Sequence, residues 1–435
     1  MRALLLGLCA TDALVVIEQT LHPRHRPPPG MPHPEVPARL ESAAAALRSA
    51  PFAPQLEWRA AGERVKADEA LAAIDRVHTD ELIATVRRLS RTGGGIECAA
   101  PRPAWNGATV RGAPTHARST RAVVVARSSD TYVAPGSWEA MVDGTCAWIE
   151  AVRLAAAGQG PALALARPPG HHATRTDAMG FCLVNFAAAA TAAHLDATPA
   201  ARVSVLDWDV HHGNGVADIL GAEPRARYSS THERGGFPYT GLDENDRGPH
   251  ANLLHLPLPA GSGGEEYLQA LRTRALPFLL PTDEPPPDVL LVCAGYDGLE
   301  SDALAGMTCS PDDFAESIRA IVDEFGFPPE RIALGLEGGY QLEDAAGMPA
   351  ALVATCAALL ERGADIDRPM HMPWAQGMST LDVLACEDRP EELKKVVRKY
   401  LAMRVRRCVL GPTSEHPLRQ KARHDFAPMI AAFLV

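Results

Sequence analysis

The sequence predicts an α/β fold in which a mostly parallel sheet is covered by helices. Between residues 120 and 360, short apolar runs alternate with helical patterns. Four of these runs have the length and composition of buried strands, and each ends in a polar or glycine-rich turn. The four predicted strands are Ala162–Ala166, Val203–Leu206, Val289–Cys293 and Ile332–Leu336.

Helical patterns fill the intervals between these runs. The alanine- and leucine-rich stretches are 138–157, 185–197, 311–325 and 342–361. The third stretch has a recognisable start, with Ser310 as the N-cap residue, Pro311 at the first helical position and acidic residues directly after it. Residues 20–38 and 98–117 are irregular in composition and are predicted to be loops.

Length and composition limit the class of protein. At about 150 residues per domain, 435 residues allow roughly three domains, or one large α/β domain with additions. The contents of 46% hydrophobic and 22% charged residues exclude a disordered chain and a coiled coil. Lys and Arg number 42 against 53 Asp and Glu, and the net charge of -11 argues against direct nucleic-acid binding while mildly favouring cationic partners.

The cysteines and the N-terminus bear on the compartment. The nine cysteines form no CxxC pair, which argues against a disulfide framework and for a reducing compartment. The apolar stretch 3–10 is too short to cross a bilayer. Arg2 and the small residues after it also fit a signal peptide, but 13–17 favours a first strand. We expect a cytoplasmic or nuclear protein without membrane contact, and organelle targeting remains open.

The predicted strands end in residues with unusual chemistry. Ligands of open α/β sheets bind beyond the carboxyl ends of the strands, so an active site is expected where these turns meet. The four turns read Arg167-Pro-Pro-Gly-His-His172, Asp207-Trp-Asp-Val-His-His-Gly-Asn214, Ala294-Gly-Tyr-Asp297 and Glu337-Gly-Gly-Tyr340.

Three of these residues suit a catalytic metal. Asp209 and His211 are two positions apart in extended chain, so their side chains point to the same side, and Asp297 can converge from another strand end. Two carboxylates and one imidazole leave a coordination position open, which fits catalytic Zn²⁺ and would also accept Fe²⁺ or Co²⁺. Alone, an Asp-x-His pair is more typical of a solvated loop than of a metal site, and it is the neighbouring motifs that favour the metal.

A histidine pair supplies candidate acid–base groups. His171 and His172 each need partners for their ring nitrogens, and Asp207 and Asn214 are available acceptors. Such an acceptor fixes the tautomer of a histidine and suits it to act as a general base near neutral pH. Tyr340, which follows two glycines, could donate a hydrogen bond to an oxyanion, although by itself it could also be an ordinary buried tyrosine.

Together these motifs resemble the zinc-dependent histone deacetylases in their class II form, including the bacterial histone deacetylase-like amidohydrolases and acetylpolyamine amidohydrolases. The resemblance extends from about His33 to about Leu360, and the motifs follow in the family's order. The matching segments are His33–Arg39, Arg167–Ala173, Gly180–Cys182, Asp207–Gly215, Ala294–Asp297 and Leu336–Tyr340.

The resemblance implies the arginase-deacetylase fold, with a single parallel sheet of about eight strands flanked by helices. Residues 1–361 would form the catalytic domain, and 362–435 a helical C-terminal extension packed on the core. By the same resemblance Asp209, His211 and Asp297 are the metal ligands.

The resemblance also implies catalytic roles. His172, hydrogen-bonded to Asn214, would be the general base and then the general acid. His171, paired with Asp207, would act electrostatically, and Tyr340 would help to stabilise the oxyanion. Arg39 would lie at the rear of the active site.

Substrate and potassium sites are implied in the same way. The acyl-lysine tunnel and its rim would be formed by Gly180, Phe181, Phe237, Leu304 and Asp130, the last of which could equally be an ordinary loop residue. A structural K⁺ would be bound by Asp207, Asp209, His211 and Ser230.

Two departures from the family pattern lie at the rim. Tyr239 stands where the family usually has glycine, and Leu304 stands where polyamine-preferring relatives place a glutamate that attracts a second ammonium group. An apolar rim fits an acyl-lysine in a peptide better than a polycation.

These observations predict a metal-dependent amidohydrolase that removes acetyl or other acyl groups from the ε-amine of lysine in proteins or peptides. An acetylpolyamine deacetylase is the alternative, and an acyl-lysine-binding scaffold with little turnover is a second. An arginase-like binuclear site would need more carboxylates where Trp208, His212 and Gly298 stand. A homo-oligomer is possible.

Overall fold

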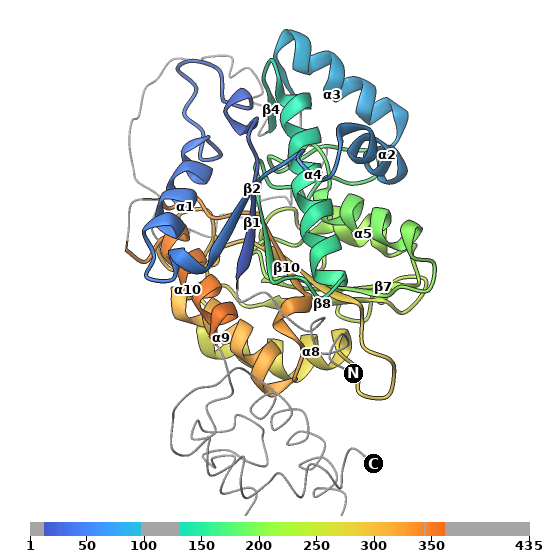
Figure 1. Ribbon diagram of the computed structural model, residues 1–435, viewed down its shortest axis with the longest axis vertical. Coiled ribbons are helices and arrows are strands. Elements are labelled where there is room, and N and C mark those ends of the chain that lie inside the picture. Colours follow the sequence, from blue (N-terminus) through green and yellow to red (C-terminus); the bar gives the residue numbers. More distant parts are fainter. Residues whose placement is uncertain (1–12, 97–130, 343–344, 362–435) are drawn as a thin grey trace, which may run out of the picture.

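An eight-stranded parallel sheet forms the centre of the molecule (Figure 1). The computed structural model describes residues 13–96, 131–342 and 345–361. The strand order is β2-β1-β5-β10-β9-β6-β7-β8, which confirms the predicted α/β fold. The strands are β1 (Leu14–Glu18), β2 (Leu56–Ala60), β5 (Ala162–Leu165), β6 (Val203–Asp207), β7 (Ala226–Glu233), β8 (Leu253–Leu258), β9 (Val289–Ala294) and β10 (Ile332–Leu336), and a separate antiparallel pair is formed by β3 (Gly94–Ile96) and β4 (Thr131–Val133).

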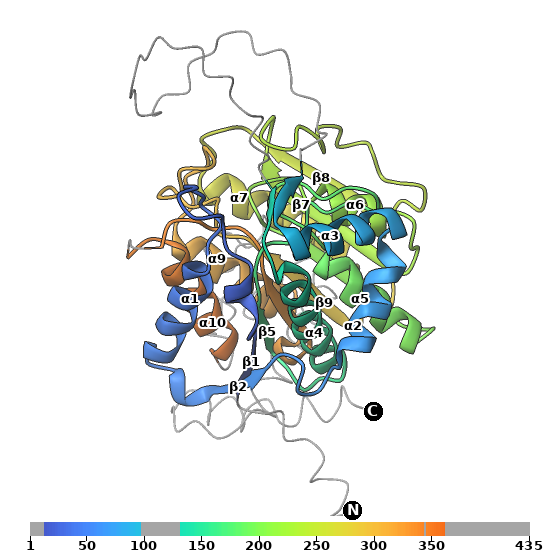
Figure 2. The same cartoon turned by 90° about the horizontal axis from the view of Figure 1, so that it is seen from above.

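Helices cover both faces of the sheet, as Figure 2 shows from above. One layer contains α2, α4 and α5, and the other contains α1, α9 and α10. The helices are α1 (Ala38–Ser49), α2 (Ala67–Val77), α3 (Asp80–Thr92), α4 (Ser137–Ala156), α5 (Phe186–Ala197), α6 (Asn214–Leu220), α7 (Gly264–Ala270), α8 (Leu276–Leu279), α9 (Pro311–Arg319) and α10 (Met348–Leu360). Short helical turns are η1 (His22–Arg24), η2 (Ala53–Gln55), η3 (Leu271–Ala275), η4 (Ala320–Glu324) and η5 (Pro329–Arg331).

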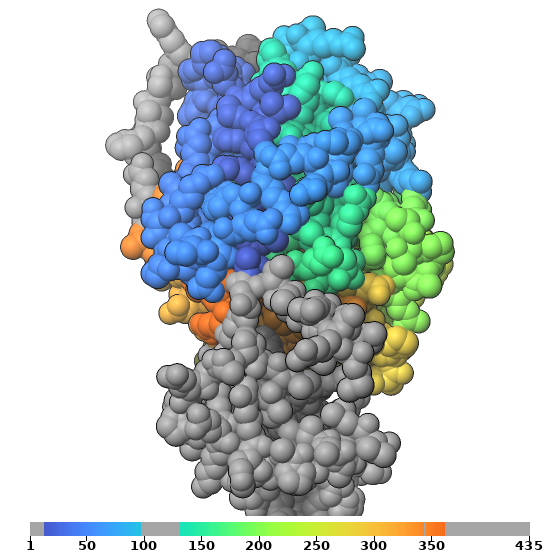
Figure 3. All heavy atoms as spheres, viewed as in Figure 1, coloured from blue at the N-terminus to red at the C-terminus, as the bar shows by residue number. Residues whose placement is uncertain are grey.

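The strands are apolar on both faces because each face packs on a helical layer. Val15 and Ile17 of β1 belong to the core under α2, α4 and α5, while Leu14 and Val16 belong to the core on the other side. Figure 3 shows the atoms of the N-terminal segments, in blue, packed beside those of α4, in teal, on the side of the molecule that faces the viewer. Because both faces of the sheet are covered, functional side chains can reach solvent or substrate only at the ends of the strands.

The four predicted strands correspond to β5, β6, β9 and β10, and the predicted first strand corresponds to β1. The capping box of Ser310 and Asp313 begins α9 as expected, after which the helix continues as the π turn η4. The last predicted helix begins at Met348 rather than at residue 342, because Gly347 is its N-cap residue and a proline stands in its first turn.

Some predictions fall on segments outside the description. These are the 98–117 loop, the C-terminal extension 362–435 and the rim residue Asp130. Within the described ranges, no helix has both the length and the apolar character needed to cross a membrane.

Candidate active site

The four motif-bearing turns meet at one edge of the sheet. β5, β10, β9 and β6 are consecutive neighbours in the strand order and all run parallel, so their carboxyl ends lie side by side. Residues separated by more than 150 positions in the sequence are thereby brought into one cluster.

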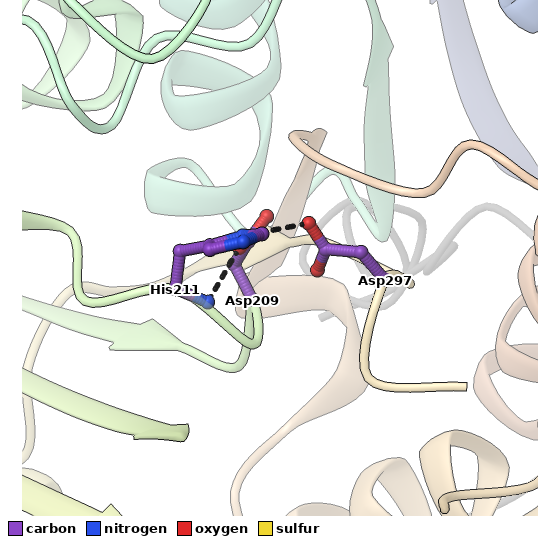
Figure 4. Close-up of side chains that lie close together, drawn as sticks. All are labelled: Asp209, His211 and Asp297. Atoms are coloured by element: carbon purple, nitrogen blue, oxygen red, sulfur yellow. Dashed lines mark hydrogen bonds and ion pairs between the residues drawn. The ribbon is translucent and has the colours of Figure 1, made fainter. Parts of the chain in front are cut away.

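Asp209, His211 and Asp297 form a compact set of possible metal ligands at this edge (Figure 4). The Nδ1 atom of His211 lies 3.2 Å from Oδ1 of Asp209 and 3.0 Å from Oδ2 of Asp297. Backbone amides orient both carboxylates, because the N–H of Val210 donates to Asp297 and the N–H of His211 donates to Asp209. Hydrogen bonds within the protein therefore hold the histidine nitrogen and one oxygen of each carboxylate close together.

Glycine backbone makes room for the carboxylates. A Cβ atom at Gly295 would lie 2.0 Å from Oδ2 of Asp209, and one at Gly338 would lie 2.2 Å from Oδ2 of Asp297. The N–H of Gly338 also donates to Asp209 at 2.8 Å. Any side chain at either glycine would displace a carboxylate from the cluster.

The ionisation of the set is typical of a cation site. Burial favours the neutral form of His211, but the charges of Asp297 and Asp209 raise its pKa well above 6.5. Burial and the charge of Asp209 raise the pKa of Asp297 to about 6. Two buried carboxylates thus hold a positive charge at Nδ1 of His211, where a metal ion would replace the proton.

The spacing also fits a divalent metal. Ligands about 2.0–2.1 Å from a tetrahedral zinc ion lie roughly 3.3 Å from one another. The two separations from His211 Nδ1, 3.2 and 3.0 Å, are close to this value. Within the described residues, this trio is the group of acidic, cysteine and histidine side chains that meets the geometry of a metal site.

The two adjacent histidines of the β5 turn have the partners that the sequence offered. Nδ1 of His171 lies 3.1 Å from Oδ2 of Asp207, and Nδ1 of His172 lies 2.8 Å from Oδ1 of Asn214. Their ring centroids are 4.0 Å apart, and the ring of His172 is 5.9 Å from that of the ligand His211. Both rings are buried beside the metal set.

Their surroundings shift the pKa values of the two histidines in opposite directions. Burial lowers the pKa of His171, but Asp209 and Asp207 outweigh it and raise that pKa to about 10. Burial and the charges of His171 and His211 hold the pKa of His172 well below 6.5. At neutral pH the pair therefore consists of one cation and one neutral base.

Tyr340 lies between an arginine and an aromatic ring. The Arg39 guanidinium stands 4.5 Å from the centroid of the Tyr340 ring and donates to the carbonyl oxygens of Gly339 and Glu337. The Phe181 ring meets Tyr340 edge-on at 5.6 Å. Burial, together with the nearby carboxylates of the metal set, raises the pKa of Tyr340 well above 10, so its hydroxyl stays protonated as a donor.

Aromatic side chains line the approach to the metal set. Gly180 has a φ of +55°, and a Cβ there would lie 2.5 Å from His172 and 2.6 Å from Phe237, so only glycine fits. Phe237 meets His172 edge-on at 5.0 Å. Phe181 packs on His33 at 4.7 Å. The predicted tunnel residues Gly180, Phe181 and Phe237 thus gather around the histidine pair.

Of the remaining predicted residues, Ser230 is buried, whereas the described residues at the rim are exposed. Ser230 is paired with Asp207 across β7 and β6, where its hydroxyl contacts Nδ1 of His232 at 2.9 Å. Leu304 is 40% exposed and Tyr239 is 37% exposed, so both lie at the surface. Asp130 lies outside the described residues.

Three residues of the site had no assigned role in the sequence. Asp302 accepts the N–H of Tyr340 at 2.6 Å and, through its other oxygen, the N–H of Leu304 at 3.0 Å. Glu337 accepts the N–H of Gly170 at 2.6 Å, directly before the histidine pair. Tyr228 donates to Asp207 at 2.8 Å. The Glu337-Gly-Gly-Tyr340 motif indicated that Glu337 lies at the site. The roles of Asp302 and Tyr228 depend on contacts with segments distant in the sequence, so no local pattern indicates them.

Comparisons with known proteins identify the family. The histone deacetylase domain model matches residues 33–356, which includes every site residue described above. An uncharacterized protein of Synechocystis sp. is 35% identical over 317 residues, covering 72% of this chain and 90% of its own. The similarity therefore spans most of both proteins.

Named relatives match over shorter segments. The histone deacetylase-like amidohydrolase of Pseudomonas aeruginosa is 36% identical over 48% of this chain and 56% of its own. Histone deacetylase 14, chloroplastic, of Arabidopsis thaliana is 35% identical over 53% of this chain and 52% of its own. The matched segment thus spans about half the length of these two relatives.

A solved structure shares the fold. The crystal structure of the HDA15 HD domain superposes with a TM-score of 0.64 and 27% identity, covering 80% of this chain and 90% of that one. The fold is therefore the arginase-deacetylase fold. With its eight-stranded sheet, its strand-end site and a family match across most of its length, the chain belongs to the histone deacetylase family.

Proposed function

We propose that this protein is a zinc-dependent amidohydrolase that removes acetyl or longer acyl groups from the ε-amine of lysine in proteins or peptides. The observation that carries the proposal is the meeting of a two-carboxylate, one-histidine set with a neutral histidine base at the end of an aromatic-lined approach. Membership of a family of deacetylases and amidohydrolases supports the same chemistry.

Asp209, His211 and Asp297 would hold the metal. A divalent ion in this set supplies a Lewis acid that polarises the amide carbonyl and lowers the pKa of an attacking water. Zn²⁺ is the proposed ion because the set is small and mixed in nitrogen and oxygen, while Fe²⁺ and Co²⁺ accept the same ligands.

His172 is proposed as the proton carrier. Its Nδ1 faces the side-chain amide oxygen of Asn214, so Nδ1 carries the hydrogen and Nε2 is free to accept a proton from the attacking water. Because its pKa lies well below 6.5, His172 returns that proton readily to the leaving amine.

Two groups are proposed to stabilise the developing negative charge. The protonated hydroxyl of Tyr340 donates a hydrogen bond to the oxyanion. His171, whose pKa is raised to about 10, contributes a buried positive charge beside His172. Asp207 keeps that charge in place, and Tyr228 fixes the orientation of Asp207. No covalent acyl intermediate is required.

A structural potassium ion is proposed behind the metal. The ligands would be oxygens of Asp207, Asp209, His211 and Ser230. The pairing of Asp207 with Ser230 in neighbouring strands supports this arrangement, because it places a carboxylate beside a hydroxyl in the interior of the sheet.

Peptide substrates are favoured over polyamines by the apolar side chain of Leu304 at the surface near Tyr340. Acetylpolyamines remain the second candidate because the net charge of -11 favours cationic substrates of either kind.

The test is release of acetate from an acetyl-lysine peptide by the purified protein, before and after chelation and again after addition of Zn²⁺, Fe²⁺ or Co²⁺. We expect activity to disappear with the metal and to return with it, at about one metal per chain by elemental analysis. A protein that holds one metal and binds the peptide without turnover would instead be an acyl-lysine-binding scaffold. Acetylated polyamines assayed in parallel decide between the two substrate classes.

A further inference from the structure

The exposed large hydrophobic side chains of the described residues are confined to two loops at the carboxyl edge of the sheet. Tyr239 and Leu242, 37% and 44% exposed, lie between β7 and β8, and Leu304, 40% exposed, lies after β9. The N–H of Gly306 donates to the carboxylate of Glu233 at 2.6 Å, which ties the two loops together. Scattered exposed apolar residues are ordinary, but their concentration beside one site indicates a contact surface.

The backbone of Tyr239 is unfavourable for a tyrosine. Its φ is +67°, a region in which a side chain costs free energy and glycine does not. Neighbouring contacts hold this conformation: the N–H of Tyr239 donates to Gly236 at 2.8 Å, and the hydroxyl of Thr240 lies 2.8 Å from Nδ1 of His212. With more than a third of the residue exposed, packing in the folded protein does not account for a tyrosine at this position.

The ring of Tyr239 lies next to Phe237, on the side of the aromatic approach that is exposed to solvent. Its centroid lies 6.3 Å from that of Phe237, which in turn meets His172 at 5.0 Å and the ligand His211 at 6.3 Å. An extended lysine side chain places its Cα roughly 6 Å from its nitrogen, given carbon–carbon bonds of about 1.5 Å. This length is close to the 6.3 Å between the Phe237 and Tyr239 rings, so a lysine whose amide lies beside Phe237 can have its main chain near Tyr239.

We propose that Tyr239, together with Leu304 on the loop after β9, is a specificity-determining residue that packs against an apolar side chain next to the acylated lysine. The inference rests on the proposed function and adds to it the class of peptide that the rim selects. Neither Tyr239 nor Leu304 offers a carboxylate, so a substrate side chain that contacts either residue gains its binding free energy from apolar burial.

The test compares three peptides that are identical except for the neighbours of acetyl-lysine, which are leucine, glycine or lysine. We expect wild-type protein to prefer the leucine peptide over the glycine peptide about tenfold in kcat/KM, mainly through KM. In Tyr239→Gly this ratio falls to about one, and in Tyr239→Phe, which keeps the ring, it stays near ten. The melting temperature of Tyr239→Gly should equal or exceed that of wild type, because glycine suits the backbone.

The same ratio is measured as Kd on the metal-loaded protein, so the inference is judged independently of turnover. If the leucine preference survives in Tyr239→Gly, or if wild type prefers the lysine peptide, the assignment of Tyr239 is wrong while the proposed function stands. If the ratio of Kd values behaves as expected but no peptide is hydrolysed, the specificity assignment stands and the proposed function fails.

Discussion

Two regions of the site are built in different ways: the floor, which is the metal set of Asp209, His211 and Asp297, and the mouth, which comprises Tyr239 and Leu304. At the floor, Asp209 and Asp297 are almost fully buried, and glycine backbone approaches them so closely that no side chain would fit. At the mouth, Tyr239 and Leu304 are more than a third exposed and belong to loops. The difference assigns the proposed chemistry to strand ends, which tolerate little change, and the proposed selectivity to loop side chains that can vary without disturbing the floor.

Loss of a floor carboxylate should have the largest effect. In Asp297→Ala, the N–H of Val210 and Nδ1 of His211 lose their shared partner, so we expect less than a tenth of the metal to remain and activity to fall by about 10³-fold or more. Elemental analysis and acetate release measure both effects. Asp243→Ala, which removes an exposed loop carboxylate, is the matched control and should stay within about twofold of wild type.

Loss of the proton carrier should separate chemistry from metal binding. In His172→Ala, the proposed general base is absent while the three metal ligands are intact, so kcat should fall by about 10²–10⁴-fold with the metal content unchanged. The measurement is kcat and KM on the acetyl-lysine peptide with metal analysis of the same sample. Activity within tenfold of wild type would assign the base to another residue.

Acid should destabilise the fold through the buried ion pair between Glu35 and Arg167. Burial by itself would raise the pKa of Glu35, but the charge and hydrogen bonds of Arg167 lower it to about 2. Since the folded pKa lies below the unfolded value of 4.5, this stability is present above pH 4.5 and is lost as the pH falls toward 2, by about 3 kcal/mol in total. Burial also lowers the pKa of His25 to about 3, so this histidine is neutral in the folded protein. Because its unfolded pKa is 6.5, the unfolding free energy decreases further as the pH falls below 6.5.

Urea unfolding at pH 7.0, 5.5 and 4.0 measures this dependence. We expect the unfolding free energy to decrease at each step, with the metal removed so that its release does not contribute. Because other buried groups, such as Asp297, also titrate in this range, the Glu35→Gln variant is compared with wild type. An unchanged pH dependence in Glu35→Gln would show that Glu35 is not linked to folding in this way.

A change at Asp302, which contacts both the floor and the mouth, should have an effect of intermediate size. One oxygen accepts the N–H of Tyr340 at the floor and the other accepts the N–H of Leu304 at the mouth. In Asp302→Asn one of these acceptors becomes a donor, so Tyr340 shifts and kcat should fall about tenfold while KM changes less than threefold. A change confined to KM would indicate that Asp302 serves the mouth alone.

The smallest effect is expected at the mouth. Leu304→Glu adds an exposed carboxylate where a second ammonium group of a polyamine would lie, and a surface ion pair of up to about 1 kcal/mol corresponds to roughly fivefold in kcat/KM for an acetylpolyamine. The gain should shrink at 0.5 M salt, because exposed charges are screened. Leu304→Gln, with nearly the same shape and no charge, is the control.

Much of the fold could be predicted because the central strands are continuous apolar runs. β5, β6, β9 and β10 are buried on both faces and therefore stand out from the polar turns that follow them. β2, with the sequence Leu-Glu-Trp-Arg-Ala, lies at the edge and is only partly buried, so it lacks this signal.

The site could be predicted where chemistry lies next to a strand end. Asp209 and His211 are two residues apart, so their convergence follows from extended backbone, but the acceptor role of Asp302 depends on how two loops meet. The positive φ of Tyr239 also could not be predicted from the sequence, because tyrosine rarely adopts this conformation and its presence does not indicate one. Local geometry is encoded in adjacent residues, whereas contacts between loops arise only from the assembled sheet.

The position of β10 has a consequence for how the chain is made. This strand, Ile332–Leu336, is the last of the sheet in sequence, yet it lies between β5 and β9 near the centre. During synthesis, β5 and β9 emerge with unpaired edges that only β10 can fill, so the two halves of the sheet stay separate until about three quarters of the chain has left the ribosome. We expect nascent chains that end before residue 332 to depend on chaperones.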